Sequence, residues 1–407
     1  MNTKLLNKAI LAYSGGLDTS AIIPWIKENY NLQVIAFVAN IGQSEEDLKS
    51  VKQKAFNSGA DGFYMLDLRH DFLCNYIYPL IHTGAIYEDN YLLGTSISRP
   101  IIAKTQVDLA IQLNAKFLCH GSTGKGNDQV RFELVYTSLA PDLEVLAPWR
   151  KWNFSSREDL LEYLKLKNIA TSATVEKIYS RDDNIWHTST EGGRLEDPWN
   201  APTNDCWVRT VDPIIAPDEP EYLSIEITQG IVTVLNGVSM TPVECLEKLN
   251  YLGSIHGIGR IDIVENRLIG MKSRGCYETP GGTIIVKALR AIEELVLDRD
   301  SRRWRSKLAL NMSYLVYDGH WFSPCCESIR SAVSVFTKLM NGEVILKLYK
   351  GSVMIIQKRS DNSLYSQKLS TFSTDKIYQH VDATGFIRLY SLPARTRAVI
   401  QNKLNNE

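Results

Sequence analysis

Apolar runs and polar-faced stretches alternate along the first part of the chain, and this alternation predicts an α/β fold. Short apolar runs, which predict strands, lie at residues 9–13, 32–38, 62–67, 116–120 and 143–147. Stretches that predict helices lie between them at residues 21–26, 45–58 and 101–114, and Pro24 fits only the first turn of its helix. Strands that alternate with helices predict a doubly wound parallel sheet, which binds ligands at the carboxyl ends of its strands.

The pattern changes after a capped helix predicted at residues 155–167. From residue 170 the chain is irregular and rich in proline, and long irregular segments are usually functional or disordered. Beyond it we expect hairpins at residues 222–228 with 231–235 and 343–349 with 352–358, and helices at 242–252, 283–308 and 324–339. Strands and helices in separate runs predict an α+β second domain.

The tail ends in a short predicted helix at residues 393–404, which is too short to be stable alone. It is either a frayed terminus or an arm that packs on a neighbouring subunit. Together these patterns divide the chain into residues 1–169, 170–372 and 373–407.

Composition excludes several classes of protein. The net charge is −1, from 45 basic and 46 acidic residues, which argues against a protein whose main task is to grip nucleic acid. No apolar run approaches the roughly 20 residues that span a bilayer, and the N-terminus lacks the apolar region of a signal peptide, so we expect a cytoplasmic protein with no membrane partner. The seven cysteines contain no C-x-x-C pair, which predicts reduced thiols and no zinc site.

A glycine-rich string follows the first predicted strand and precedes the first predicted helix. It reads Ala12-Tyr13-Ser14-Gly15-Gly16-Leu17-Asp18-Thr19-Ser20. A strand, a glycine turn with hydroxyls and a helix start form an arrangement that binds phosphate. The string is neither a Walker A loop nor a dinucleotide fingerprint. A carboxylate near phosphate is repulsive unless a divalent cation lies between them, so Asp18 implies Mg²⁺. The alternative is a serine-rich turn in which Asp18 is an ordinary helix N-cap.

A second glycine-rich string follows the strand at residues 116–120, on the same predicted edge of the sheet. It reads His120-Gly121-Ser122-Thr123-Gly124-Lys125-Gly126-Asn127-Asp128 and continues to Arg131 and Glu133. Three glycines allow a close backbone approach, and Arg131 can clamp a carboxylate with two parallel hydrogen bonds. The alternative is a polar turn that leads into a helix capped by Asn127 or Asp128.

Three further strings are dense in polar residues. Tyr91 and Ser96 bracket a predicted turn that presents two hydroxyls, although Pro100 as the first residue of a helix explains much of that string. Residues 180–189 and 259–282 form the other two. Alternation around Glu265 suggests a strand with one wet face, from which Glu265 and Tyr277 could face a ligand. By spacing alone these charges would remain surface salt bridges.

Together these strings resemble the argininosuccinate synthase family over nearly the whole chain. The resemblance implies an adenine nucleotide α-hydrolase-like ATP-binding domain, an α+β synthetase domain and a C-terminal oligomerisation arm in a homotetramer. It implies that the enzyme joins citrulline and aspartate with ATP and Mg²⁺, releases AMP and pyrophosphate through a citrullyl-AMP intermediate, and serves arginine biosynthesis.

The resemblance also implies roles for the matching residues. Ala12, Tyr13, Ser14, Gly15, Gly16, Leu17, Asp18, Thr19, Ser20, Ala39 and Gly121 are implied to contact ATP, with Asp18 at the metal. Thr123, Asn127 and Asp128 are implied to contact aspartate. Tyr91, Ser96, Asn127, Arg131, Ser180, Ser189, Glu265 and Tyr277 are implied to contact citrulline. Asp18, Asn127, Asp128 and Arg131 form the expected catalytic set. Position 40 is Asn where some members carry Asp, so no side-chain role is assigned there.

Two rival functions predict different features. A tRNA-thiolating enzyme of the same loop type would need a reactive cysteine beside the loop and a basic surface, and neither is evident. A non-catalytic nucleotide sensor would need neither the second glycine loop nor the polar strings of the added domain.

Overall fold

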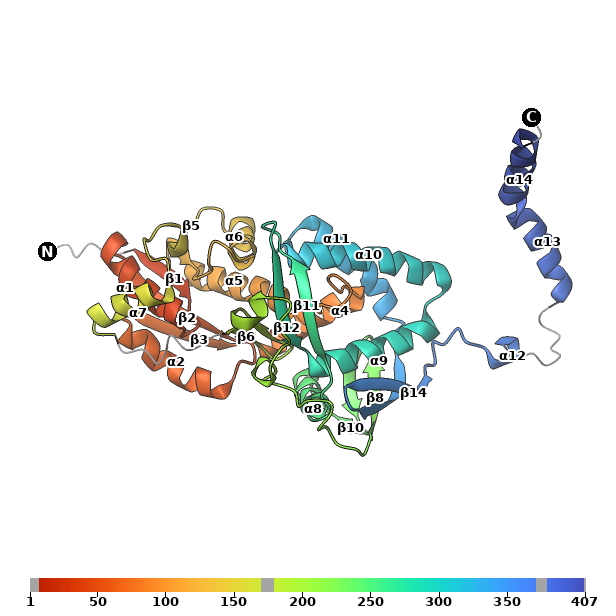
Figure 1. Ribbon diagram of the computed structural model, residues 1–407, viewed down its shortest axis with the longest axis horizontal. Coiled ribbons are helices and arrows are strands. Elements are labelled where there is room, and N and C mark those ends of the chain that lie inside the picture. Colours follow the sequence, from red (N-terminus) through yellow and green to blue (C-terminus); the bar gives the residue numbers. More distant parts are fainter. Residues whose placement is uncertain (1–6, 170–178, 371–378, 406–407) are drawn as a thin grey trace. The chain divides into compact units, whose positions relative to one another are not determined.

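The computed structural model describes residues 7–169, 179–370 and 379–405 of the chain (Figure 1). The chain forms two compact units, Met1–Asn362 and Ser363–Glu407.

The first unit begins with a parallel sheet of five strands. These are β1 (Lys8–Ala12), β2 (Gln33–Asn40), β3 (Gly62–Asp67), β4 (Phe117–Cys119) and β5 (Glu144–Leu146). Their order across the sheet is β3-β2-β1-β4-β5, and every neighbouring pair is parallel. The doubly wound parallel sheet predicted from the alternating pattern is confirmed.

Helices cover both faces of this sheet (Figure 1). They are α1 (Leu17–Tyr30), α2 (Glu45–Asn57), α5 (Gly94–Gln112), α6 (Asp128–Leu139) and α7 (Arg157–Leu166), with a 3₁₀ turn η2 (Pro148–Arg150). Successive strand residues point to opposite faces, so Ile10 packs in the core that includes α5 and α6, whereas Leu11 packs in the core that includes α1 and α7. Ser156 and Asp159 form the capping box of α7, which confirms the predicted start of this helix.

Two helices begin earlier than the sequence predicts. Helix α1 begins at Leu17 and α5 at Gly94, so Pro24 and Pro100 lie inside helices rather than in their first turns. Each proline removes one N–H donor. Both prolines are buried, and packing of the surrounding apolar residues offsets the lost hydrogen bond.

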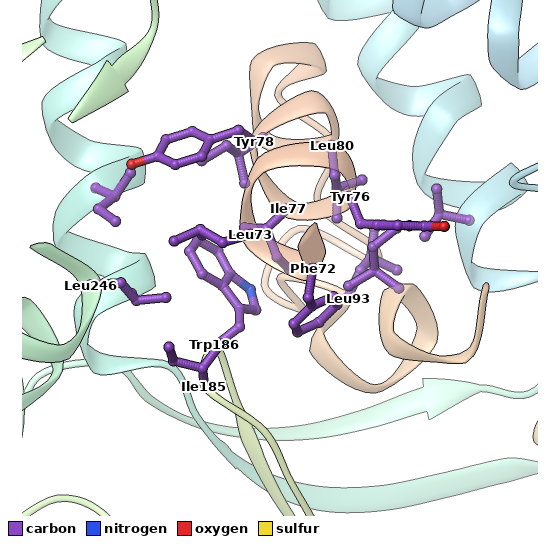
Figure 2. Close-up of a cluster of buried hydrophobic side chains, with 14 of the residues drawn as sticks. Phe72, Leu73, Tyr76, Ile77, Tyr78, Leu80, Leu93, Ile185, Trp186 and Leu246 are labelled. Carbon is purple, nitrogen blue, oxygen red and sulfur yellow. The ribbon is translucent and has the colours of Figure 1, made fainter. Parts of the chain in front are cut away.

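A continuous apolar core joins the parallel sheet to the rest of the first unit. A segment of α3 (Arg69–Asp71), the π-helix η1 (Phe72–Ile77) and α4 (Tyr78–Thr83) follows β3. Figure 2 shows Trp186, from the second half of the unit, between Leu246 of α8 and Phe72 of η1. The indole N–H of Trp186 donates a 3.2 Å hydrogen bond to the carbonyl oxygen of Leu92, which fixes the ring in this core.

The second half of the first unit contains two antiparallel sheets. One has the order β11-β12-β7-β6 and the other β10-β9-β8-β13-β14. The strands are β6 (Ser180–Asp183), β7 (Thr188–Glu191), β8 (Glu221–Thr228), β9 (Ile231–Leu235), β10 (Val238–Ser239), β11 (Arg260–Asn266), β12 (Lys272–Glu278), β13 (Gly342–Tyr349) and β14 (Ser352–Arg359). Both predicted hairpins are confirmed. Strands β6 and β7 lie where the sequence predicts an irregular stretch, part of which (residues 170–178) is outside the described residues.

The helices of this half are α8 (Pro242–Ile255), α9 (Pro280–Val296), α10 (Arg299–Tyr317) and α11 (Pro324–Thr337), with 3₁₀ turns η3 (Gly193–Glu196) and η4 (Asn204–Cys206). The prediction of a single helix at residues 283–308 is wrong, because α9 ends at Val296 and a separate helix, α10, begins at Arg299. The carboxylate of Asp298 accepts the N–H groups of Asp300 and Ser301 and thereby starts a new helix. Separate sheets and helices confirm the α+β character of this half.

In its described residues, 363–370 and 379–405, the second unit carries three helices: α12 (Gln367–Ser370), α13 (His380–Tyr390) and α14 (Leu392–Leu404). The predicted terminal helix is confirmed, and α13 is an addition to it. None of the side chains in α13 and α14 is buried.

The helices across the described ranges are all too short or too polar to span a bilayer. All seven cysteines are free thiols, and five of them are buried: Cys119, Cys206, Cys245, Cys276 and Cys326.

Candidate active site

Loop 1, residues 13–16, connects β1 to α1 and presents hydrogen-bond donors. Gly16 occupies the N-cap position of α1 and has no side chain to cap the helix. The first N–H groups of a helix have no partner within the helix, and the helix dipole favours an anion there. Ser14 Oγ accepts the N–H of Gly16 at 3.3 Å and lies 3.1 Å from Thr19 Oγ1. The hydroxyls of Tyr13 and Ser20 lie 3.0 Å apart. This arrangement suits phosphate.

Asp18 lies in the first turn of α1. Gly16, not Asp18, is the N-cap residue, so the alternative of an ordinary N-cap carboxylate is wrong. Burial raises the pKa of Asp18, and the positive charge of Arg157 opposes that rise. Among the described residues no three His, Cys, Asp or Glu side chains cluster as metal ligands. A metal at Asp18 would therefore take its other ligands from phosphate and water, which is how Mg²⁺ commonly binds.

Loop 2, residues 120–127, lies against the start of α1 because β4 and β1, the strands before the two loops, are neighbours in the sheet. A Cβ atom on Gly121 would lie 2.9 Å from Cγ2 of Thr19, so this approach requires glycine. Ala39 is buried near the carboxyl end of β2, on the other side of β1. The residues predicted to contact ATP thus share one edge of the sheet.

The side chain of Asn40 has a structural role. Its Oδ1 accepts the N–H of Gly42 at 3.0 Å, so this side chain closes the turn after β2.

His120 is engaged within the protein. Its Nδ1 accepts the N–H of Ser122 at 3.3 Å, and its Nε2 lies 3.0 Å from Oε1 of Glu133. These contacts engage both ring nitrogens. We assign His120 to the support of loop 2.

Asp128, the first residue of α6, pairs with two arginines. Nη2 of Arg99 lies 2.8 Å from Oδ2, and Nη1 of Arg131 lies 2.9 Å from Oδ1. Burial alone would raise the pKa of Asp128, but the two positive charges hold it at about 2. Asp128 is therefore ionised at neutral pH. It accepts hydrogen bonds well, but it is a poor general base.

Two other predicted aspartate contacts, Asn127 and Thr123, lie in loop 2 just before α6. Asn127 is buried, its side chain does not cap α6, and its Oδ1 has no hydrogen-bond partner in the part of the chain that the structure describes. The alternative of a simple capping residue therefore fails for Asn127. A buried amide oxygen without a partner is costly, which points to a ligand that donates to it. Thr123 is exposed in the same loop.

Ser96 lies in the first turn of α5, and Tyr91 precedes the helix in a β-bridge with Tyr87. The phenolic oxygen of Tyr91 accepts the N–H groups of Thr95 at 3.0 Å and Ser96 at 3.3 Å and so caps the helix. Ser96 Oγ is buried, with no hydrogen-bond partner among the described residues. The ring of Tyr91 lies 4.9 Å, centroid to centroid, from that of Tyr277.

The β11-β12-β7-β6 sheet supplies the remaining predicted citrulline contacts. Tyr277 on β12 is the cross-strand partner of Ser189 on β7. The hydroxyl of Tyr277 donates to Oε1 of Glu191 at 3.2 Å. Ser180, an exposed residue of β6, is the cross-strand partner of Glu191.

Glu265 on β11 is buried, whereas its spacing alone favours a surface salt bridge. It shares a strand face with Ile261 and Ile263, since alternate residues of a strand point the same way. Burial raises the pKa of Glu265 to about 7, and a 2.9 Å hydrogen bond from the hydroxyl of Tyr317 opposes that rise. Oε2 of Glu265 has no hydrogen-bond partner within the described ranges.

The structure adds five residues that the sequence interpretation does not single out: Arg99, Asp182, Glu191, Arg267 and Tyr317. Arg99, Asp182 and Arg267 each lie inside one of the three polar strings, so their charge could have drawn attention to them. Nη2 of Arg267 lies 2.8 Å from Oε2 of Glu191, beside the hydroxyl of Tyr277. Tyr317 lies in no motif, and only the folded chain reveals it.

Comparisons with known proteins agree with this geometry. The family model described as "Arginosuccinate synthase N-terminal HUP domain" matches residues 8–170, and "Arginosuccinate synthase C-terminal domain" matches residues 179–397. A protein named argininosuccinate synthase from Erwinia tasmaniensis is 61% identical over 99% of this chain and 100% of its own length. Proteins of the same name from Serratia proteamaculans (60% identity, 100% of both chains) and Photorhabdus laumondii (62% identity, 98% of this chain and 99% of its own length) match similarly.

A solved structure, the U34-tRNA thiolase NcsA from Methanococcus maripaludis, covers 42% of this chain and 61% of its own, with a TM-score of 0.28 and 15% identity. That likeness supports no conclusion. The two family models and the full-length relatives do: the chain belongs to the argininosuccinate synthase family of ligases.

Proposed function

We propose that the two glycine loops and the β11-β12-β7-β6 sheet divide one reaction between them. The family membership makes the chain a ligase that joins citrulline and aspartate with ATP as co-substrate, in arginine biosynthesis. The observation that supports our assignment best is the close approach of loop 2 to the first turn of α1, at Gly121 and Thr19. It puts a helix start that suits phosphate beside the loop that we assign to the amino-acid substrates.

The chemical problem is that the ureido group of citrulline is a poor electrophile, because its oxygen would leave as hydroxide. In the first step, the ureido oxygen attacks the α-phosphorus of ATP and pyrophosphate leaves. In the second step, the amine of aspartate attacks the ureido carbon and AMP leaves with that oxygen. The second step also releases a proton from the amine.

Loop 1 would hold the pyrophosphate as its charge develops. Its backbone N–H groups and the hydroxyls of Ser14, Thr19 and Ser20 donate to negative oxygens without rearrangement, which is the basis of electrostatic stabilisation. Asp18 would hold Mg²⁺, which neutralises phosphate charge when bound.

Loop 2 and the start of α6 would orient both amino acids. Arg131 would pair with the carboxylate of citrulline, and Tyr91, Ser96, Ser180, Ser189, Glu265 and Tyr277 would line the rest of its site. Asn127, Thr123 and Asp128 would hold aspartate. The low pKa of Asp128 fits an acceptor that directs the amine without removing its proton. Positioning of this kind supplies up to about 7–11 kcal/mol in good cases.

The structure does not supply the reactive cysteine that the rival function, a tRNA-thiolating enzyme, would need beside the loops. Cys119 ends β4 directly before loop 2 and is fully buried. Burial raises the pKa of the Cys119 thiol, so it remains protonated and unreactive.

We also propose that residues 1–169 form the ATP-binding part, 170–372 the synthetase part and 373–407 an oligomerisation arm of a homotetramer. Apolar side chains on the arm are exposed within the chain, which supports an arm that packs on another subunit: Val381, Phe386, Ile387, Leu389, Leu392, Val399, Ile400 and Leu404. Free thiols fit a reducing compartment and thus a cytoplasmic location.

Product analysis tests the proposal. Incubation with ATP, Mg²⁺, citrulline and aspartate should yield AMP, pyrophosphate and argininosuccinate, and omission of either amino acid should abolish argininosuccinate. Formation of ADP, or nucleotide binding without turnover, would overturn the proposal.

A further inference from the structure

Tyr317 is the last residue of α10, and it is almost completely buried. Its carbonyl oxygen accepts a 2.8 Å hydrogen bond from Nε of Arg131. The last carbonyl groups of a helix have no partner within the helix, and the helix dipole is negative at this end. The C-terminus of α10 is therefore a natural place to dock a guanidinium group.

The ring of Tyr317 also contacts Arg131. The guanidinium carbon of Arg131 lies 4.8 Å from the ring centroid, within cation–π range. Gly319 makes this approach possible, since a Cβ atom there would lie 2.9 Å from Cα of Arg131 and its φ is +94°. These two contacts and the ion pair of Nη1 with Asp128 fix the orientation of Arg131, and its Nη2 group is left for a carboxylate.

The hydroxyl end of the Tyr317 side chain contacts a carboxyl group, whereas its ring and its backbone carbonyl contact the cationic Arg131. The hydroxyl of Tyr317 donates to Oε1 of Glu265 at 2.9 Å. Two further tyrosines hold the ring in place: Tyr87 stacks on it at 3.7 Å with an interplanar angle of 3°, and Tyr91 meets it edge-on at 6.4 Å. Tyr317 is therefore a rigid link between Arg131 and Glu265.

We propose that Tyr317 is a positioning residue that sets the spacing between Arg131 and Glu265 and thereby selects an α-amino acid by its two charged ends. This inference rests on the proposed function, in which citrulline binds at these residues. The α-carboxylate pairs with the Arg131 fork, and the α-ammonium pairs with the buried carboxylate of Glu265. A ligand that lacks either charge leaves a buried partner uncompensated, which is costly.

Ionisation of Glu265 is part of this selection. The titratable and charged groups that face it are Glu191, Arg131, Arg267, Tyr87, Tyr91, Tyr277 and Tyr317. Burial and the negative charge of Glu191 favour the neutral acid, whereas Arg131, Arg267 and the Tyr317 hydroxyl favour the carboxylate. Removal of that hydroxyl therefore leaves more of the neutral form at pH 7, which attracts an ammonium group less.

Tyr317→Phe tests the proposal, since it keeps the ring and the carbonyl oxygen but removes the hydroxyl. The expected result is a KM for citrulline raised about tenfold at pH 7, and an acidic limb of kcat/KM for citrulline moved up by about one pH unit. The KM for ATP should stay within about twofold, which also shows that the variant is folded. Tyr314→Phe, one turn earlier on α10 with a half-exposed ring, is the matched control and should match the wild type.

The outcomes separate the two claims. If the wild-type protein forms no argininosuccinate, the proposed function itself fails. If it does, an unchanged citrulline KM and pH profile in Tyr317→Phe overturn the role of Tyr317. Equal increases in KM for citrulline and ATP also overturn it, because they indicate a general structural effect. A citrulline analogue without the α-amino group should lose binding to the wild type but be nearly insensitive to Tyr317→Phe; equal sensitivity would contradict the assignment of Glu265 to the ammonium group.

Discussion

Nη2 of Arg99 lies 2.8 Å from Oδ2 of Asp128 and joins α5 to the first residue of α6, 29 residues further along the chain. The same nitrogen lies 3.0 Å from Oδ2 of Asp182 on β6. One guanidinium group thus holds a proposed substrate contact at the start of α6 against the second half of the unit. Its planar fork suits two carboxylates, which a lysine ammonium cannot bridge in the same way.

We predict that Arg99→Lys raises the KM for aspartate by about ten- to hundredfold, because a charged hydrogen bond to Asp128 or Asp182 is lost. The KM for ATP should change little. Steady-state kinetics with each substrate varied in turn provides the measurement. Arg303→Lys, at an exposed position on α10, is the control. An unchanged KM for aspartate would remove Arg99 from the site.

We predict that Asp18→Asn folds normally and loses most pyrophosphate release, by about a hundredfold or more, because a neutral amide binds Mg²⁺ far less well than a carboxylate. A pyrophosphate assay at several Mg²⁺ concentrations measures the loss, and circular dichroism checks the fold. Asp142→Asn, at an exposed position, should behave like the wild type. Normal turnover in Asp18→Asn would refute the metal role.

Arg131→Lys should weaken citrulline binding much more than ATP binding. The lysine ammonium cannot keep the bond to the Tyr317 carbonyl and the ion pair with Asp128 while it also presents two parallel donors. The ratio of the two KM values, relative to the wild type, is the measurement. Equal losses for both ligands would count against the assignment.

Glu265→Gln should stabilise the protein at pH 8 and have little effect at pH 5. Burial raises the folded-state pKa of Glu265 to about 7, above the ordinary value of 4.5, so its ionisation costs stability as the pH rises from 4.5 through 7. The gain at pH 8 should be at most about 3 kcal/mol in the free energy of unfolding. Denaturant unfolding at both pH values measures it, with Glu226→Gln at an exposed position as the control.

The citrulline KM of Glu265→Gln should rise in the same preparation. A variant that is more stable at pH 8 and binds citrulline less well would show that Glu265 is kept for function at a cost in stability. Loss of stability at pH 8 would contradict the raised pKa.

Much of the fold follows from local sequence patterns. The parallel sheet was predictable because its buried strands read as apolar runs, and the two hairpins because their strands flank short turns. Strands β6 and β7 could not be predicted, because they are short and polar and because β7 pairs with β12, a strand more than 80 residues further along the chain. The starts of α1 and α5 were predicted too late, because Pro24 and Pro100 were each placed in a first helical turn. Tertiary packing outweighs the loss of one hydrogen bond, so both prolines lie inside their helices.

Some parts of the candidate site were predictable from the sequence and others were not. Loops 1 and 2 were predictable because strands that precede them fix their place on the sheet. The burial of Glu265 could not be predicted, because its neighbours in the sequence do not reveal which residues cover β11. Tyr317 lies 186 residues from Arg131, and only folding brings them together. Contacts of this range leave no local signal.

The central claim is that the ureido oxygen of citrulline is transferred to AMP. The most direct test uses citrulline labelled with oxygen-18 in the ureido group, followed by mass spectrometry of the products. Our account predicts one labelled oxygen in AMP and none in pyrophosphate or argininosuccinate. Label recovered in water or in inorganic phosphate would contradict it.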